Sequence, residues 1–101
     1  MNSFPLYSNI RNQIKNKNVI ITKEIKEQFK KDFKKLDVDS HELIYALIRA
    51  YQLDNNINTG NLLAFKARQL KYGVKYNLNE LPSDLINILI YFIEMDLNKN
   101  N

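Results

Sequence analysis

The sequence predicts a mainly α-helical fold in which three helices form one domain. A short strand or β-hairpin separates the second helix from the last, and an N-terminal arm precedes them. Within residues 22–52, apolar side chains recur every three or four positions in two segments joined by a polar turn, which is the pattern of two amphipathic helices. Residues 74–79 instead alternate apolar and polar side chains before the most apolar segment, residues 85–97, as in a strand followed by a core helix.

Length and composition exclude several classes of protein. The chain has 101 residues and no cysteine, so it is expected to form one domain without a disulfide framework or a thiolate metal site. Its longest unbroken apolar stretch, Ile88–Ile93, is too short to cross a bilayer, and the N-terminus lacks the pattern of a signal peptide. We therefore expect a soluble intracellular protein, cytoplasmic or nuclear, that does not contact a membrane.

We divide the chain into an N-terminal arm, residues 1–21, and a helical domain, residues 22–101. The arm holds an isolated apolar cluster at residues 4–7, and Ile10 and Ile14 follow at helical spacing. We expect this arm to lie outside the core and to dock either on its own domain or on a neighbouring molecule.

The first helix of the domain is predicted to begin after Thr22, a favourable N-cap residue. Glu24 and Glu27 fall in its first turns and four lysines in its last, so each sign of charge lies at the helix end that it stabilises. These lysines are Lys30, Lys31, Lys34 and Lys35. The apolar stripe comprises Ile25, Phe29, Phe33 and Leu36.

The second helix is predicted from Ser40 to about Gln52. Asp39, with Glu42 three residues later, resembles a capping box. The apolar face comprises Leu43, Ile44, Leu47, Ile48 and Tyr51. A loop over residues 54–60 follows because its composition is typical of turns.

Residues 61–72 are a candidate short basic helix, which Gly73 closes either as a C-cap or as the hinge before the strand. In the strand that follows, Val74, Tyr76 and Leu78 share one face, and Lys75, Asn77 and Asn79 share the other. Pro82 suits the first turn of the last helix, where Ser83 or Asp84 accepts a hydrogen bond from a free amide. This helix is apolar nearly all round, which predicts that it packs between other helices or buries one face against a partner.

Three segments together suggest a family. Residues 27–37 contain a helix ending in a Lys-Leu turn, residues 43–48 belong to a second apolar helix, and residues 74–85 hold the alternating strand, Leu81-Pro82-Ser83 and the start of the last helix. In this order, over residues 22–97, they resemble the NET (extra-terminal) domain, which lies downstream of tandem bromodomains and in some transcription-complex subunits. The resemblance implies a non-enzymatic module that binds an extended peptide by strand addition, in a transcription or chromatin-related assembly.

The resemblance also implies where the peptide binds. Lys75, Asn77 and Asn79 are expected to line one side of the added strand, beside Glu80. The apolar groove is expected to comprise Ile44, Leu47, Ile48, Val74, Tyr76, Leu78 and Leu89.

Partners in this family often alternate lysine with aliphatic residues, but the strand of this chain has few carboxylates. Only Glu80 and Asp84 are acidic there, so attraction for a lysine-rich peptide is expected to be weak. The partner is then neutral or acidic, or the groove serves within an assembly. Residues 14–21 themselves alternate lysine with other residues, so they are a candidate ligand for the chain's own groove or for that of a second copy.

Two other classes of function stay open. Residues 1–36 hold nine Lys or Arg and three Asp or Glu, whereas residues 37–101 hold six and eight, and a basic face can track phosphates. The candidate nucleic-acid contacts are Lys30, Lys31, Lys34, Lys35, Lys66, Arg68 and Lys71. Alternatively, the last helix and the arm lock the chain into a homo-oligomer or a larger particle.

An enzyme is not expected. His41 is the single histidine and lies beside the predicted cap of the second helix, and the two glycines, Gly60 and Gly73, do not form a phosphate-binding loop. No nucleophile with a base and no set of metal ligands can be assembled from these residues. We therefore predict no catalytic site, no metal and no cofactor.

Overall fold

A computed structural model describes residues 5–14, 20–57, 65, 67–71 and 73–98. The described part is mainly helical, as the sequence predicts, and its helices are α1 (Pro5–Ile14), α2 (Lys23–Phe33), α3 (Val38–Asp54) and α4 (Ser83–Asn98). Between α3 and α4 lie two three-residue strands, β1 (Arg68–Leu70) and β2 (Gly73–Lys75), and a 3₁₀ turn, Leu78–Glu80. None of the helices in these ranges is long and apolar enough to span a membrane.

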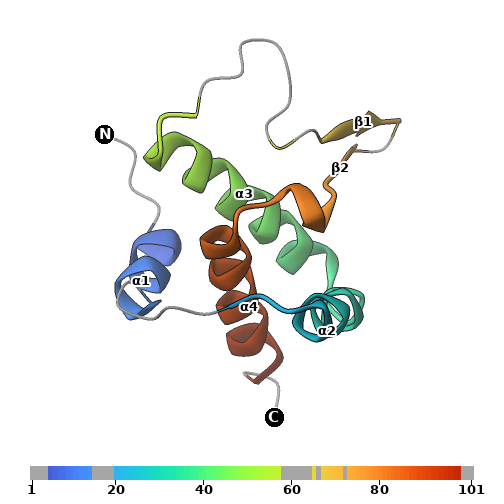
Figure 1. Ribbon diagram of the computed structural model, residues 1–101, viewed down its shortest axis with the longest axis horizontal. Coiled ribbons are helices and arrows are strands. Elements are labelled where there is room, and N and C mark those ends of the chain that lie inside the picture. The colour runs from blue at the N-terminus through green and yellow to red at the C-terminus, as the bar shows by residue number, and fades with distance from the viewer. Residues whose placement is uncertain (1–4, 15–19, 58–64, 66, 72, 99–101) are drawn as a thin grey trace.

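Helix α4 lies at the centre of the molecule, where α1, α2 and α3 surround it (Figure 1). Its apolar side chains are buried on several sides, which explains why the helix is apolar nearly all round. The buried apolar residues are Leu85, Ile86, Ile88, Leu89, Phe92 and Ile93. Pro82 precedes the first helical residue, and its carbonyl accepts a hydrogen bond from the amide of Ile86 at 3.0 Å, in agreement with the start predicted from the sequence.

The caps of α2 and α3 differ in how well the sequence predicts them. Thr22 Oγ1 accepts a hydrogen bond from the amide of Ile25 at 3.2 Å, so the predicted N-cap of α2 is confirmed. Helix α3 begins earlier than predicted, because Asp37 and not Asp39 is its N-cap and accepts a hydrogen bond from the amide of Ser40 at 2.8 Å.

Ser40 is therefore inside α3, where it is buried. Its hydroxyl donates a hydrogen bond of 2.9 Å to the carboxylate of Asp96, which is also buried near the end of α4. This pair joins the start of α3 to the end of α4. A start of the helix at Asp39 would change the position of the hydroxyl relative to α4.

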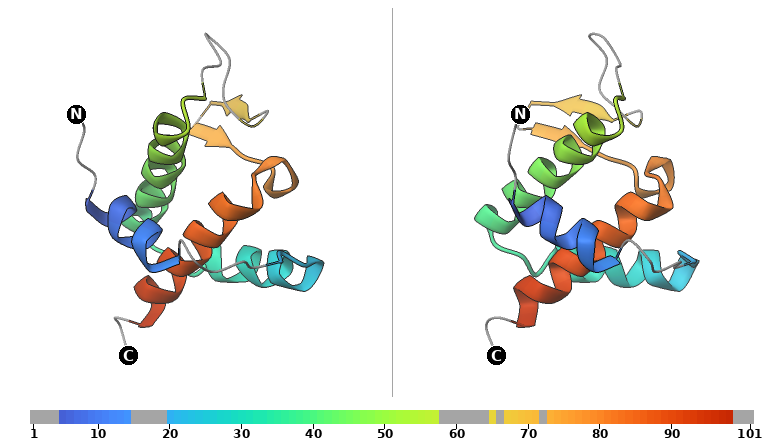
Figure 2. Two further views of the ribbon diagram at one scale, coloured as in Figure 1. Left: turned by 60° about the vertical axis from the view of Figure 1, so that its left-hand side comes forward. Right: turned by 90° about the vertical axis from the view of Figure 1, so that its left-hand side faces the viewer.

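The predicted strand over residues 74–79 is wrong beyond Lys75. β1 and β2 pair antiparallel, with Leu70 opposite Gly73 and Arg68 opposite Lys75, at the end of the molecule away from the C-terminus of α4 (Figure 2). After Lys75, the Asn77 side chain accepts a hydrogen bond from the amide of Asn79 at 2.9 Å and opens the 3₁₀ turn. The alternation of apolar and polar residues over 74–79 thus reflects a strand only as far as Lys75; beyond it, the apolar residue Leu78 is buried by the 3₁₀ turn.

The predicted helix over residues 61–72 is wrong at residues 68–70, which form β1. Residues 58–64, 66 and 72 lie outside the described residues.

The region expected as an arm contributes to the core. Helix α1 packs against α4 and α3 and buries Tyr7, Ile10 and Ile14. The expectation that this stretch stays outside the core is therefore wrong for residues 5–14. The candidate self-ligand, residues 14–21, falls mostly on residues 15–19, which lie outside the described residues, while Ile14 is buried in α1.

Candidate functional site

A groove of about 580 Å³ lies between α2, α3, the hairpin and the 3₁₀ turn, with Leu89 of α4 in its floor. Most of its lining residues are apolar or aromatic: Phe29, Phe33, Ile44, Tyr45, Ile48, Leu70, Tyr76, Leu78, Leu81 and Leu89. Three lysines with exposed side chains complete the lining, Lys30 and Lys34 from the α2 segment and Lys75 from β2. We call this cavity the lysine-rimmed groove.

The floor of the lysine-rimmed groove belongs to the hydrophobic core. Ile44 and Ile48 of α3 are each 2% exposed, and Leu89 of α4 is 1% exposed. Side chains packed in this way keep their positions, because moving them would open voids in a close-packed interior. The floor is therefore formed before any ligand arrives.

Aromatic side chains form two walls. The rings of Phe29 and Phe33 on α2 lie 6.1 Å apart, and those of Tyr45 on α3 and Tyr76 after β2 also lie 6.1 Å apart. Burial raises the pKa of the Tyr76 hydroxyl and nearby Tyr45 raises it further, against the smaller opposing effect of the Arg49 guanidinium. Tyr76 therefore stays neutral at physiological pH and offers a ligand an apolar ring with one hydroxyl.

The lysine-rimmed groove brings together many of the residues that the sequence singled out for peptide binding. They are Ile44, Ile48, Lys75, Tyr76, Leu78 and Leu89. Leu47 is not in the lining, because it is 0% exposed inside the core. Val74 was also expected in the groove; its main chain belongs to β2, next to the lining residue Lys75.

The polar residues after β2 lie elsewhere. Asn77, Asn79 and Glu80 are exposed around the 3₁₀ turn and are not among the lining residues. Asn79 accepts a hydrogen bond from the Lys26 ammonium at 3.1 Å, which ties the turn to α2. The expectation that Asn77 and Asn79 continue the strand beside Lys75 is thus wrong, because the strand has already ended.

Sequence reasoning missed several residues of the lysine-rimmed groove: Phe29, Phe33, Tyr45, Leu70 and Leu81. Phe29 and Phe33 belong to the apolar stripe that the sequence predicts for α2. However, α2 buries none of its residues fully. Tyr45 is 40% exposed and Leu70 is 46% exposed. The sequence of α2 has two aromatic residues and few aliphatic ones. This composition favours a helix that packs loosely on the surface of the core over one that is buried in it.

The basic residues considered for nucleic-acid binding do not form one cluster. Lys30 and Lys34 line the lysine-rimmed groove, whereas the exposed Lys31 and Lys35 do not. Lys35 lies 3.6 Å from the carboxylate of Asp32.

On the hairpin, Arg68 is exposed and stands opposite Lys75, and Lys71 is exposed in the turn. Lys66 lies outside the described residues.

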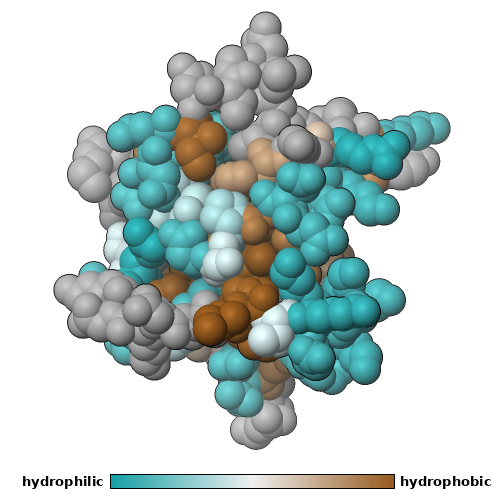
Figure 3. Space-filling view, in the orientation of Figure 1, coloured by the Kyte–Doolittle hydropathy of each residue, from teal (hydrophilic) through white to brown (hydrophobic). Residues whose placement is uncertain are grey.

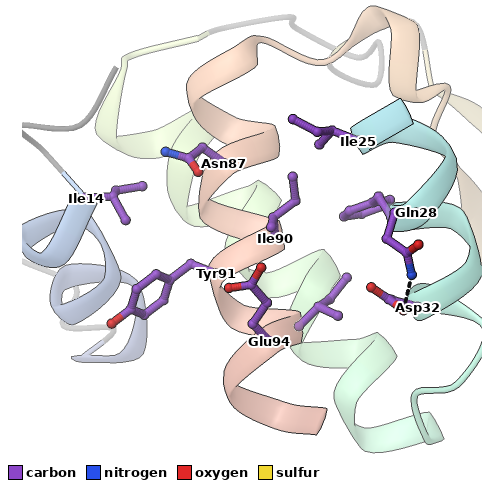
Figure 4. A pocket seen from close by; sticks show the side chains of 10 residues that line it. Ile14, Ile25, Gln28, Asp32, Asn87, Ile90, Tyr91 and Glu94 are labelled. Atoms are coloured by element: carbon purple, nitrogen blue, oxygen red, sulfur yellow. Dashed lines mark hydrogen bonds between the residues drawn. The ribbon is translucent and has the colours of Figure 1, made fainter. Parts of the chain in front are cut away.

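A second pocket, of about 390 Å³, lies between α1, α2 and α4. Figure 4 shows Ile25 and Ile90 between α2 and α4, with Asp32 and Glu94 nearby. In the orientation of Figure 1, apolar side chains gather near the middle of the face, between hydrophilic surfaces on either side (Figure 3). Phe29 lines both this pocket and the lysine-rimmed groove, so α2 separates the two.

His41 has a structural position. Its Nε2 lies 2.8 Å from the carbonyl oxygen of Phe33, and its ring stacks on the Phe33 ring at 4.3 Å between centroids. These contacts fix the turn between α2 and α3. Among the described residues, no group of three or more His, Cys, Asp or Glu is placed to hold a metal ion.

Comparison of the chain with protein-family models, with curated proteins and with solved structures found no match.

Proposed function

We propose that this chain is a non-enzymatic interaction module whose lysine-rimmed groove binds an extended segment of another protein. One observation carries the proposal: an open groove with a preformed apolar floor lies beside a short hairpin. Apolar side chains of a ligand would leave water on this floor, which supplies affinity in proportion to the area buried. A groove lined mostly by hydrophobic and aromatic side chains with a few polar groups is typical of binding sites.

The hairpin supports strand addition as the mode of binding. Two residues separate Leu70 from Gly73, as in a two-residue hairpin turn. In such a turn the closing pair, Leu70 and Gly73, forms the hydrogen bonds between the two strands. The main-chain N–H and C=O groups of the next pair, Gln69 and Val74, then point away from the partner strand, toward the outer edges of the hairpin. The outer edge of β2 leads to Lys75 and Tyr76, which line the lysine-rimmed groove. A peptide paired with this edge would place alternate side chains toward the apolar floor.

The resemblance of residues 22–97 to the NET domain supports the same function. It implies a peptide-binding module, and it places such a module in a transcription or chromatin-related assembly, in the cytoplasm or nucleus. The lysine-rimmed groove includes residues of the elements for which the resemblance implies it, namely the second helix of the domain, the strand and the last helix, and α2 adds a wall that was not expected.

Affinity selection from a library of random peptides tests the proposal. We expect the selected peptides to share apolar residues at alternate positions, and Tyr45→Ala to weaken their binding at least about tenfold, as is usual for an aromatic residue at the centre of an interface. Tyr45 is a better choice than Leu78, because Leu78 is 8% exposed and belongs to the core, so that its replacement would also destabilise the fold. Leu70→Ser, at a second exposed lining residue, should act in the same direction.

Leu53→Ser is the matched control, because Leu53 is an exposed leucine on α3 that does not line the lysine-rimmed groove. N-methylation of the peptide at alternate residues tests strand addition. In an added strand only alternate residues direct their main-chain N–H groups toward β2, so methylation of one alternate set removes these donors and methylation of the other set does not. Unchanged affinity of Tyr45→Ala and Leu70→Ser, with the fold of each verified by circular dichroism, would rule out the groove as the binding site.

Nucleic-acid binding is the second candidate, because Lys30, Lys34 and Lys75 converge on one cavity. Binding of a single-stranded oligonucleotide would then weaken steeply as salt is raised. Peptide binding on an apolar floor would depend on salt much less.

A further inference from the structure

The charges around the lysine-rimmed groove have one sign. Lys30 and Lys34 come from the α2 segment and Lys75 comes from β2, yet all three line the same cavity. Among the described residues that line it, none carries a carboxylate. An apolar groove bordered by positive charge attracts and orients anionic ligands.

Two acidic residues, one from α2 and one from α4, line the other cavity. Asp32 of α2 and Glu94 of α4 line the second pocket, whose described lining contains no lysine or arginine. Gln28 donates a hydrogen bond of 2.9 Å to Asp32 there. The charged residues that line the two cavities thus differ in sign, and Phe29 lines both; Lys35, which lines neither, lies 3.6 Å from the carboxylate of Asp32. A helix with a merely solvated polar face does not require this separation.

Two arginines add to the positive charge. Arg68 stands directly opposite Lys75 in the hairpin, and its side chain is exposed. The guanidinium of Arg49 on α3 acts on Tyr76, where it partly opposes the rise in pKa that burial and Tyr45 cause. Acidic residues of the neighbouring segments, such as Glu27, Glu42 and Glu80, are exposed but do not line the groove.

We propose that the ligand of the lysine-rimmed groove is an acidic segment, an extended stretch of a partner protein in which apolar anchors alternate with Asp or Glu. This inference rests on the proposed function and specifies the chemistry of its ligand. Alternate side chains of an added strand would meet the apolar floor, and the carboxylates between them would form charge-assisted hydrogen bonds with Lys30, Lys34 and Lys75. A segment with lysine at the same positions would meet like charges, which disfavours binding.

Three short peptides test the inference. They share the anchors Ile-x-Val-x-Ile and differ only in whether x is Glu, Lys or Ser. Each is titrated into the full-length, ¹⁵N-labelled chain at low and physiological salt. We expect the Glu peptide to bind best and to shift the amide signals of Lys30, Lys34, Lys75 and Tyr76. The Lys peptide should bind at least about tenfold more weakly, because several partly exposed ion pairs are replaced by like charges.

A pair of double variants separates the groove from general electrostatic attraction. Lys30→Glu with Lys34→Glu reverses two lining charges, and Lys31→Glu with Lys35→Glu reverses two exposed charges next to them that do not line the groove. Both variants change the net charge equally. We expect the first to weaken binding of the Glu peptide by about tenfold or more and the second by less than about twofold. Thermal unfolding verifies that both variants are folded.

The outcomes separate this inference from the proposed function. Binding of the Ser or Lys peptide in the groove, with the Glu peptide weaker, would overturn the acidic ligand and leave peptide binding intact. Equal losses in the two double variants would overturn the inference, because attraction by net charge alone then explains binding. Failure of all three peptides to shift signals from the groove would also overturn it, while the peptide selection with Tyr45→Ala decides the proposed function separately.

Discussion

At the scale of single residues, one buried tyrosine joins α1 to α3 and a second joins α3 to α4. The hydroxyl of Tyr7 donates to the carboxylate of Asp54 at 2.8 Å, and that of Tyr51 donates to Asp84 at 2.8 Å. The guanidinium of Arg11 lies 3.8 Å from both carboxylates. Because Arg11 and the aspartates are partly exposed, these ion pairs contribute little alone. The buried hydroxyls, by contrast, need their acceptors.

The two tyrosines predict how stability depends on alkaline pH. Burial, and next to it the hydrogen bonds to Asp54 and Asp84, raise the pKa of the Tyr7 and Tyr51 hydroxyls, and these effects together bring the pKa of Tyr51 to about 12. The folded state thus favours the protonated phenols, whose full contribution is present below the unfolded pKa of about 10. As pH rises above that value the unfolded chain ionises first, and each tyrosine should cost about 1 kcal/mol of stability by pH 11.

Urea unfolding at pH 9 and pH 11 measures this loss. Replacement of both tyrosines by phenylalanine should make the chain less stable at pH 9 and less sensitive to the step to pH 11. Tyr45→Phe, at an exposed tyrosine, controls for the number of phenols. An equal loss between the two pH values in the double variant and the wild type would contradict the assigned role of these hydroxyls.

Single residues also show where sequence reasoning succeeds and where it stops. Thr22 was predicted correctly as a cap because its partner, the amide of Ile25, lies in the same segment. The sequence predicts Asp39 as the cap because Glu42, three residues later, completes a local pattern. In the structure Asp37 is the cap and accepts from the amide of Ser40, whose hydroxyl bonds Asp96, a partner 56 residues away. Such a distant contact leaves no local signal.

At the scale of elements, α2 is the most loosely packed of the helices in the described part of the chain. It has no fully buried residue, whereas the other three helices have several each. Phe29 and Phe33 pack partly against the core, and His41 holds the C-terminal end through its contacts with Phe33. Helix α2 also forms one wall of both cavities.

Hydrogen exchange in the native state should detect this difference. Because α2 buries little apolar surface, we expect its amides to exchange through local opening, with an opening free energy at least roughly 1.4 kcal/mol below that of α4, or about tenfold in rate. Equal opening free energies in α2 and α4 would mean that α2 exchanges only by global unfolding. Addition of a peptide that fills the groove should slow exchange in α2 more than in α1.

The element between α3 and α4 was the hardest to predict. Alternation over residues 74–79 predicted a strand, but only residues up to Lys75 pair in the hairpin. Asn77 then starts a 3₁₀ turn, because its side chain satisfies the amide of Asn79 locally. Leu78 is buried by the turn as it would be by a strand, so the apolar pattern alone does not distinguish the two.

At the scale of the whole molecule, the core includes both ends of the described chain. Tyr7, Ile10 and Ile14 of α1 belong to the same buried cluster as Phe92 and Ile93 of α4. The sequence of α1 carries only a two-turn apolar pattern, too short to distinguish a core helix from a docked arm. Helix α1 belongs to the core because it packs against both α3 and α4. These two helices are far from α1 in the sequence and come together only in the folded chain.

This arrangement predicts that α1 unfolds together with the rest of the domain. Ile10 is 1% exposed, so Ile10→Ala should lower the free energy of unfolding by about 2–5 kcal/mol through lost burial and the cavity left behind. Asn12→Ala, at an exposed position of the same helix, should change it by less than about 0.5 kcal/mol. Chemical unfolding followed by far-ultraviolet circular dichroism and by tyrosine fluorescence measures both. If α1 is only a docked arm, Ile10→Ala will detach it and leave the main transition unchanged; a shift of the whole transition, coincident for both probes, makes α1 part of the cooperative core.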